Sequence, residues 1–309
     1  IRMPNSMLEK ISLEQWQASG HYFTHNSNEI FYRTHPSVFI ESAELNRLDQ
    51  DNKPVLLLIH GFPTSSWDWH KLWFPLSEHY QLVAADMLGF GFSDKPKSAD
   101  YRISEQADIQ ESLLQHLGIS SYHILAHDYG DTVTQELLAR NIKRPGTIQS
   151  VVLLNGGLFP ETHQPLLVQK LLLSPIGSIV SRLMTEKKFN SSFDKICKQP
   201  IEVDELASFW QQIQYNHGQK IFHKLIRYMS ERRLHRERWV SALQHSSPSI
   251  ALINGSADPI SGAHMVSRYR ELIRDEYIYE IPDAGHYPQI ETPSLVLDAF
   301  FAFEKDCSE

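Results

Sequence analysis

The sequence predicts an α/β fold, in which a mostly parallel sheet is flanked by helices and interrupted by a helical insertion. Three observations support this. Short apolar runs such as Val55–Ile59 alternate with helical patterns, as is typical of parallel strands joined by right-handed crossovers. The runs are continuously apolar, as expected of strands buried on both faces. From Gly156 to Ser247 we find helical patterns and no convincing strand. We therefore expect a core of residues 1–156 and 247–309 and a helical cap of residues 157–246.

The first part of the core begins with a region rich in aromatic and β-branched residues, residues 20–45, which predicts antiparallel strands at 21–24, 30–33 and 38–40. The elements expected next are a strand at 55–59, a helix at 69–76, a strand at 81–85, a helix at 104–117, a strand at 122–126, a helix ended by Pro145-Gly146, and a strand at 150–155.

The insertion and the second part of the core follow. Helices are expected in the insertion at 166–173, 176–184, 202–215 and 220–233, and the core then continues with a strand at 249–254, a helix at 262–273, a strand at 277–281 and a helix at 294–303. Ligands of such sheets bind at the carboxyl ends of the strands. We therefore expect the insertion to roof the site.

Composition excludes several classes of function. The chain has 309 residues, 41% of them hydrophobic, and a net charge of −8, which permits a large core and does not favour nucleic-acid binding. Five arginines lie between Arg227 and Arg238, but Glu231 and Glu237 interrupt them. This pattern predicts a solvated helix face.

Cysteine content and hydropathy predict a cytoplasmic protein. The two cysteines, Cys197 and Cys307, indicate neither a disulfide framework nor a metal cluster. No apolar run reaches the roughly 18 residues of a membrane span, and no signal peptide is evident. The sequence does not predict the oligomeric state.

The stretch around Asp128 is the most informative motif. A strand pattern stops at His127-Asp128-Tyr129-Gly130 and a helical pattern starts, which is the context of a nucleophile elbow. Ala126 and Gly130 supply the small residues that let strand and helix approach each other. The nucleophile position holds Asp128 instead of serine or cysteine.

Two further strand ends carry the residue types that a nucleophile needs. Asp258 follows the strand at 249–254, and His286 follows the strand at 277–281. The order nucleophile, acid, histidine is that of the α/β-hydrolases. Glu161 is an alternative acid because it follows the strand at 150–155, but Asp258 fits the more common position. The predicted oxyanion-hole donors are the backbone N–H groups of Phe62 and Tyr129.

Several motifs together resemble the epoxide hydrolase and haloalkane dehalogenase branch of the α/β-hydrolases. They are His60-Gly-Phe-Pro63 with Trp69, Asp86-x-x-Gly-x-Gly-x-Ser93, His127-Asp-Tyr-Gly130, Asp258 and Gly285-His286. The resemblance covers residues 20–305. It implies an α/β-hydrolase fold with a cap and a small apolar electrophile as substrate, without a metal or organic cofactor.

An aspartate nucleophile predicts a particular chemistry. Attack on a saturated carbon gives an alkyl ester, which water activated by His286 then hydrolyses. Asp258 holds the imidazole in the required tautomer.

The leaving group separates the activities that the resemblance implies. Dehalogenases typically place tryptophan after the nucleophile, where this chain has Tyr129, so epoxide hydrolysis is favoured. In the epoxide hydrolases that this chain resembles, tyrosines of the cap donate a proton to the epoxide oxygen. The candidates here are Tyr228 and Tyr215. For each of them, an ordinary position on an amphipathic helix is the alternative interpretation. Trp67 and Trp69 are expected to line the pocket or to pack below it. Dehalogenation, lactone opening and a catalytically silent, ligand-binding protein stay as alternatives.

Overall fold

The computed structural model describes residues 10–36 and 53–308, and it confirms the α/β prediction with a sheet in the order β1-β2-β4-β3-β5-β6-β7-β8. The strands are β1 (His21–His25), β2 (Asn28–His35), β3 (Val55–Ile59), β4 (Gln81–Ala85), β5 (Tyr122–His127), β6 (Ile148–Leu154), β7 (Ser249–Gly255) and β8 (Ile278–Ile281). The hairpin β1-β2 is antiparallel and β2 pairs antiparallel with β4, while β3 to β8 are mutually parallel. The strand expected at 38–40 lies outside the described residues.

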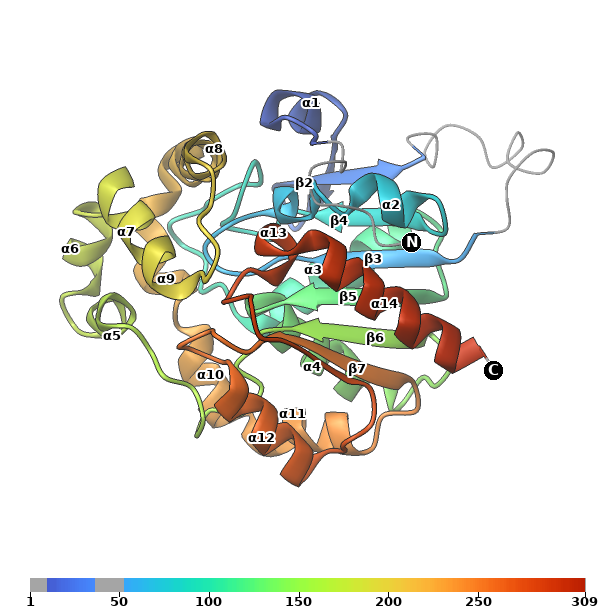
Figure 1. Ribbon diagram of the computed structural model, residues 1–309. Coiled ribbons are helices and arrows are strands. Elements are labelled where there is room, and N and C mark those ends of the chain that lie inside the picture. Colours follow the sequence, from blue (N-terminus) through green and yellow to red (C-terminus); the bar gives the residue numbers. More distant parts are fainter. Residues whose placement is uncertain (1–9, 37–52, 309) are drawn as a thin grey trace.

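Helices cover both faces of the sheet (Figure 1). In that view α2 (Trp73–Ser77) and α14 (Pro293–Ser308) lie in front, and α3 (Ile103–His116) and α4 (Tyr129–Asn141) lie behind. The remaining helices of this part are α1 (Leu13–Ala18), the 3₁₀ helix η3 (Ser66–Trp69), α12 (Ala263–Leu272) and α13 (Pro288–Glu291). The helix expected at 69–76 is therefore two shorter elements. Pro75 accounts for the late start of α2, because proline is tolerated only in the first turn of a helix.

The segment between β6 and β7 contains helices and no strand, and every one of its residues is described. Its elements are α5 (Leu167–Leu173), α6 (Gly177–Arg182), α7 (Glu186–Ile196), α8 (Val203–Gln214), η4 (Tyr215–Ile221), α9 (Phe222–Leu225), α10 (Tyr228–Leu234) and α11 (Arg236–Gln244). The sequence did not predict α7 and α11. The helix expected at 220–233 is broken into shorter pieces. We call residues 157–246 the helical segment.

The helices α5 to α9 of the helical segment lie beyond the ends toward which the strands β5 and β6 point, while α11 lies beside the sheet (Figure 1). Those are the carboxyl ends, where ligands of such sheets bind. No helix in the described ranges is long and apolar enough to cross a membrane.

Candidate active site

Asp128 occupies a sharp turn between β5 and α4. Its backbone has φ 47° and ψ −102°, a conformation that residues other than glycine rarely adopt. Gly130 permits this turn, because a Cβ on it would lie 2.3 Å from the carbonyl oxygen of Ile59 in β3. The side chain of Asp128 is buried at the carboxyl end of the sheet. Strained backbone of this kind is found at functional sites.

The structure brings together the three residues predicted from three strand ends. The Nδ1 atom of His286 lies 2.7 Å from Oδ2 of Asp258, and its Nε2 atom lies 3.9 Å from Oδ2 of Asp128. The second distance is too long for a hydrogen bond, but such contacts are often long when no substrate is bound. The imidazole therefore lies between the two carboxylates.

Asn155, which the sequence analysis did not identify, holds Asp258 in place. Its Nδ2 donates to Oδ2 of Asp258 at 3.0 Å. The Ser261 hydroxyl donates to the same oxygen at 2.9 Å, and the Ile260 amide donates to Oδ1 at 2.8 Å. Burial alone would raise the pKa of Asp258, but the charge of His286 and the hydrogen bonds from His286, Asn155 and the Ile260 amide lower it. Asn155 directly follows β6, just as Asp128 follows β5, so its position after a strand could have identified it from the sequence.

The alternative acid, Glu161, lies elsewhere. Its carboxylate pairs with Arg236 and Arg268, and its side chain is about one third exposed. The imidazole of His286 pairs with Asp258 instead.

The loop after β3 supplies the first predicted oxyanion donor. The backbone N–H of Phe62 donates to Oδ2 of Asp128 at 3.3 Å. The following Phe62–Pro63 peptide bond is cis. The other predicted donor, the amide of Tyr129, is the first of helix α4 and adjoins the nucleophile in the chain.

Arg232 of α10 is a further residue beside Asp128, and it corrects the prediction of a solvated arginine face. Its side chain is only 2% exposed, with Nη2 3.5 Å from Oδ1 of Asp128. Nη2 also donates to the backbone oxygen of Asp128 at 3.2 Å, and Nε donates to the Thr132 hydroxyl at 2.8 Å. Arg232 follows Tyr228 by four residues, so both lie on one side of α10, and its guanidinium lies over the Tyr228 ring.

The two candidate proton donors have different surroundings. Tyr228 is buried, with its ring centroid 4.7 Å from that of Tyr129. Burial, the charge of Asp128 and hydrogen bonding to that carboxylate raise the pKa of Tyr228. Tyr215 instead packs against Phe92 and lies 4.9 Å from the Lys95 ammonium. The structure thus places Tyr228, and not Tyr215, at Asp128.

Trp67 and Trp69 are buried, and neither lines the cavity that opens onto Asp128 and His286. Trp67 stacks on His70, and its indole N–H donates to the backbone oxygen of Ile11. Trp69 is fully buried. The 3₁₀ helix that carries them directs both rings into the protein core, so the expectation that they line the pocket is corrected.

Charges at the site favour an ionised Asp128. Burial alone would raise the pKa of Asp128, but the nearby charges of His286 and Arg232 hold it below its usual range. Burial lowers the pKa of His286, but the carboxylates of Asp258 and Asp128 outweigh that effect and raise it to about 10. Without substrate, His286 and Asp128 therefore form an ion pair.

A cavity of about 70 Å³ opens onto Asp128 and His286. Most of its wall is apolar and comes from the helical segment, mainly from α5 and α7. The lining residues are Phe62, Pro63, Asp128, Leu166, Val168, Gln169, Leu172, Met184, Phe189, Ser192, Phe193, Ile196, Phe222, Ile260 and His286. This surface suits a small apolar molecule.

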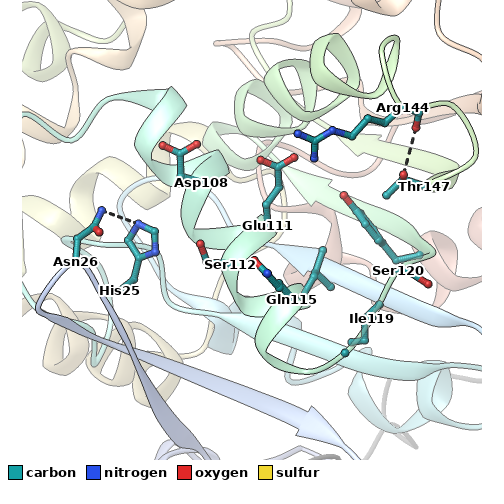
Figure 2. A pocket seen from close by; sticks show the side chains of 13 residues that line it. His25, Asn26, Asp108, Glu111, Ser112, Gln115, Ile119, Ser120, Arg144 and Thr147 are labelled. Carbon is teal, nitrogen blue, oxygen red and sulfur yellow. Dashed lines mark hydrogen bonds between the residues drawn. The ribbon is translucent and has the colours of Figure 1, made fainter.

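A wider hollow of about 700 Å³ lies along α3 and contains none of the three strand-end residues. Its lining is polar (Figure 2). The carboxylates of Asp108 and Glu111 point toward it but pair with Arg140. Within residues 10–36 and 53–308, no group of three or more His, Cys, Asp or Glu residues is placed to hold a metal.

Comparison with known proteins agrees with this architecture. Residues 54–293 match the model of the alpha/beta hydrolase fold family. The chain is 41% identical to the mesoderm-specific transcript homolog protein of Bos taurus, over 94% of this chain and 88% of that protein.

Two solved structures share the fold. One is a haloalkane dehalogenase variant from Bradyrhizobium elkanii (TM-score 0.75, 18% identity, 94% of this chain and 97% of that one). The other is a Klebsiella pneumoniae protein assigned to the epoxide hydrolases (TM-score 0.73, 16% identity, 93% and 97%). The family match covers most of the sheet and the whole helical segment, and the chain therefore belongs to the alpha/beta hydrolase fold family.

Proposed function

We propose that the protein is a cofactor-free hydrolase that uses Asp128 as its nucleophile and acts on small apolar epoxides. The observation that supports this most directly is the nucleophile itself, a buried carboxylate on a strained turn with His286 and Asp258 behind it. We also propose that the helical segment acts as a cap, because its residues form most of the cavity wall.

In the first step, an oxygen of Asp128 attacks an epoxide carbon and the carbon–oxygen bond of the ring breaks. Oδ2 already accepts the Phe62 amide, so we assign the attack to Oδ1. Tyr228 donates its hydroxyl proton to the departing oxygen. The product of this step is an ester between Asp128 and a hydroxyalkyl group.

In the second step, His286 removes a proton from water, and the water oxygen attacks the carboxyl carbon of Asp128. The resulting negative charge forms on Oδ2, where the amides of Phe62 and Tyr129 stabilise it. Asp258 stabilises the imidazolium. The intermediate collapses, and the diol leaves with the proton that His286 took from water. The second proton of the water returns to Tyr228, and Asp128 is regenerated with one oxygen from water.

Release of a halide is less favoured by this site. A halide needs N–H donors in the pocket, and neither Phe62 nor Tyr129 carries one in its side chain. A lactone would be opened by the same nucleophile, and a silent protein would bind a ligand in the same pocket without turnover. Neither of these two functions uses the proton donor that Tyr228 offers beside Asp128.

The test measures whether the carboxylate of Asp128 takes up oxygen from water and forms a covalent adduct. The protein is incubated with styrene oxide and with haloalkanes in water labelled with heavy oxygen, and the Asp128 peptide is analysed by mass spectrometry. We expect label in Asp128 with the epoxide. His286→Gln should trap the ester as a mass increase on the same peptide, whereas Asp128→Asn should show neither signal. Diol formation without label or adduct would contradict the ester route, and ligand binding without any product would indicate a silent protein.

A further inference from the structure

The outer surface of the helical segment carries a concentration of exposed aliphatic side chains. Of the eleven large hydrophobic residues that are exposed in the described ranges, six lie between residues 167 and 183. They are Leu167, Leu171, Leu173, Ile176, Ile179 and Leu183, which we call the α5–α6 surface. Leu167, Ile179 and Leu183 are 72%, 55% and 59% exposed. Exposed hydrophobic residues scattered singly are normal, but a group of this kind marks an interaction site.

The α5–α6 surface lies at the outer end of the molecule. In Figure 1 its two helices lie on the far side of the helical segment from the sheet. Within the described part of the chain, the exposed fraction of these six side chains ranges from 37% to 72%.

Basic residues surround this surface, although the protein as a whole is acidic. Residues 167–198 contain six basic and two acidic residues, a net charge of +4, in a chain of net charge −8. The lysines at 170, 187, 188 and 195 are exposed. Apolar side chains flanked by lysine and arginine are the pattern of a surface that lies in the interface of an anionic membrane.

A groove connects this surface to the wall of the catalytic cavity. It has a volume of about 710 Å³, and leucines of α5 and lysines of α7 line it. Leu166, Val168 and Ser192 line both this groove and the cavity that contains Asp128. The exposed side of α5 therefore faces outward while its other side lines the catalytic cavity.

We propose that the α5–α6 surface docks onto a lipid bilayer that contains anionic headgroups. The aliphatic side chains enter the interface, and the lysines of α5 and α7 contact the headgroups. Docking in this orientation places the catalytic cavity close to the bilayer, where apolar molecules concentrate. The proposal does not rest on the chemistry at Asp128, because binding to vesicles is measured without substrate.

The test is co-flotation of the full chain with vesicles of phosphatidylcholine alone and of phosphatidylcholine with phosphatidylglycerol in a roughly 2:1 ratio. We expect binding to the anionic vesicles that weakens as salt is added. The triple variant Leu167→Ser, Ile179→Ser, Leu183→Ser should bind more weakly by about tenfold or more. Lys170→Gln with Lys187→Gln should weaken binding to the anionic vesicles only.

The control replaces two aliphatic residues outside this surface that are more exposed than those of the triple variant. Val203 and Leu234 are each 77% exposed, and Val203→Ser with Leu234→Ser should bind as the unaltered chain does. Thermal unfolding of each variant checks that it is folded.

Three results would overturn the proposal. One is no binding to anionic vesicles. Another is equal loss of binding in the control variant. The third is a dimer that the triple variant converts to a monomer while vesicle binding is unchanged, since the surface would then bind a second copy of the chain.

Discussion

At the scale of single residues, the two oxygens of Asp128 have different partners. Oδ2 accepts the Phe62 amide and faces His286, while Oδ1 lies next to the Arg232 guanidinium. The first set of contacts suits an oxygen that becomes an oxyanion. The second set keeps a buried carboxylate ionised, since a nearby positive charge offsets the cost of burial.

Arg232→Met tests this assignment. Removing one partner of a buried ion pair should lower the free energy of unfolding by about 3 kcal/mol. The pKa of Asp128 should rise, so the acid limb of the rate of ester formation should move to higher pH. Single-turnover kinetics and denaturant unfolding measure the two effects. The exposed neighbour Arg233 provides the control, because Arg233→Met should change neither. An unchanged acid limb in Arg232→Met would show that the guanidinium does not control the nucleophile.

The two chemical steps should respond differently to pH. Ester formation needs ionised Asp128, whose pKa lies below its usual range, so its rate should be constant over roughly pH 5 to 9. Ester hydrolysis needs neutral His286, whose pKa of about 10 depends partly on the charge of Asp128. That charge disappears when the ester forms, so the pKa of His286 should fall. The hydrolysis rate should therefore rise with pH and level off below pH 10. Rapid-quench measurements over this range check both steps, and parallel profiles would contradict the assignment.

At the scale of elements, α10 presents Tyr228 and Arg232 to Asp128 from one side. The four-residue spacing between Tyr228 and Arg232 was visible in the sequence. The sequence did not show whether that face of the helix is turned toward the protein or toward solvent, because the same spacing occurs on a solvated face. The helices α7 and α11 were missed for a related reason. In both, the apolar residues are few and lie among charged ones, although Phe189, Phe193 and Ile196 of α7 follow a helical spacing and are buried. Helix α11 packs on α4.

Tyr228→Phe and Tyr215→Phe form a matched pair at this scale. Loss of a general acid typically lowers a rate by about 10² to 10⁴, so Tyr228→Phe should slow turnover of an epoxide by about 100-fold or more. Tyr215→Phe should leave it unchanged, since Tyr215 packs against Phe92. Steady-state kinetics with styrene oxide distinguish the two variants. Equal rates in both would remove Tyr228 from the proposed mechanism.

At the scale of the whole molecule, Glu136 of α4 links that helix to the helical segment. Its carboxylate accepts hydrogen bonds from Arg140 in α4 and from Arg238 and Trp239 in α11. Burial raises the pKa of Glu136, but the hydrogen bonds from Arg238, Trp239 and Arg140 lower it to about 2. The stabilisation is therefore present above the unfolded pKa of about 4.3 and is lost as pH falls toward 2.

Glu136→Gln should accordingly lower the free energy of unfolding at pH 7 by about 2 kcal/mol, less than for a fully buried pair because Arg238 is half-exposed. The difference from the unaltered chain should shrink as pH falls below about 4. Thermal unfolding at several pH values measures this difference. Glu237→Gln serves as the control, because Glu237 adjoins Arg238 in the chain but is exposed. A difference that stays constant with pH would show that the charge of Glu136 contributes nothing.

The sequence by itself determined the α/β class, the positions of most strands along the chain and the three strand-end residues Asp128, Asp258 and His286. Buried parallel strands are continuously apolar, and their carboxyl ends meet at one edge of the sheet, so both features follow from local pattern and chain order. Only the tertiary structure decided which side chains from the helical segment reach that edge. It placed Arg232 and Tyr228 at the nucleophile and Tyr215 away from it, because the orientation of a helix depends on long-range packing that its own periodicity does not specify.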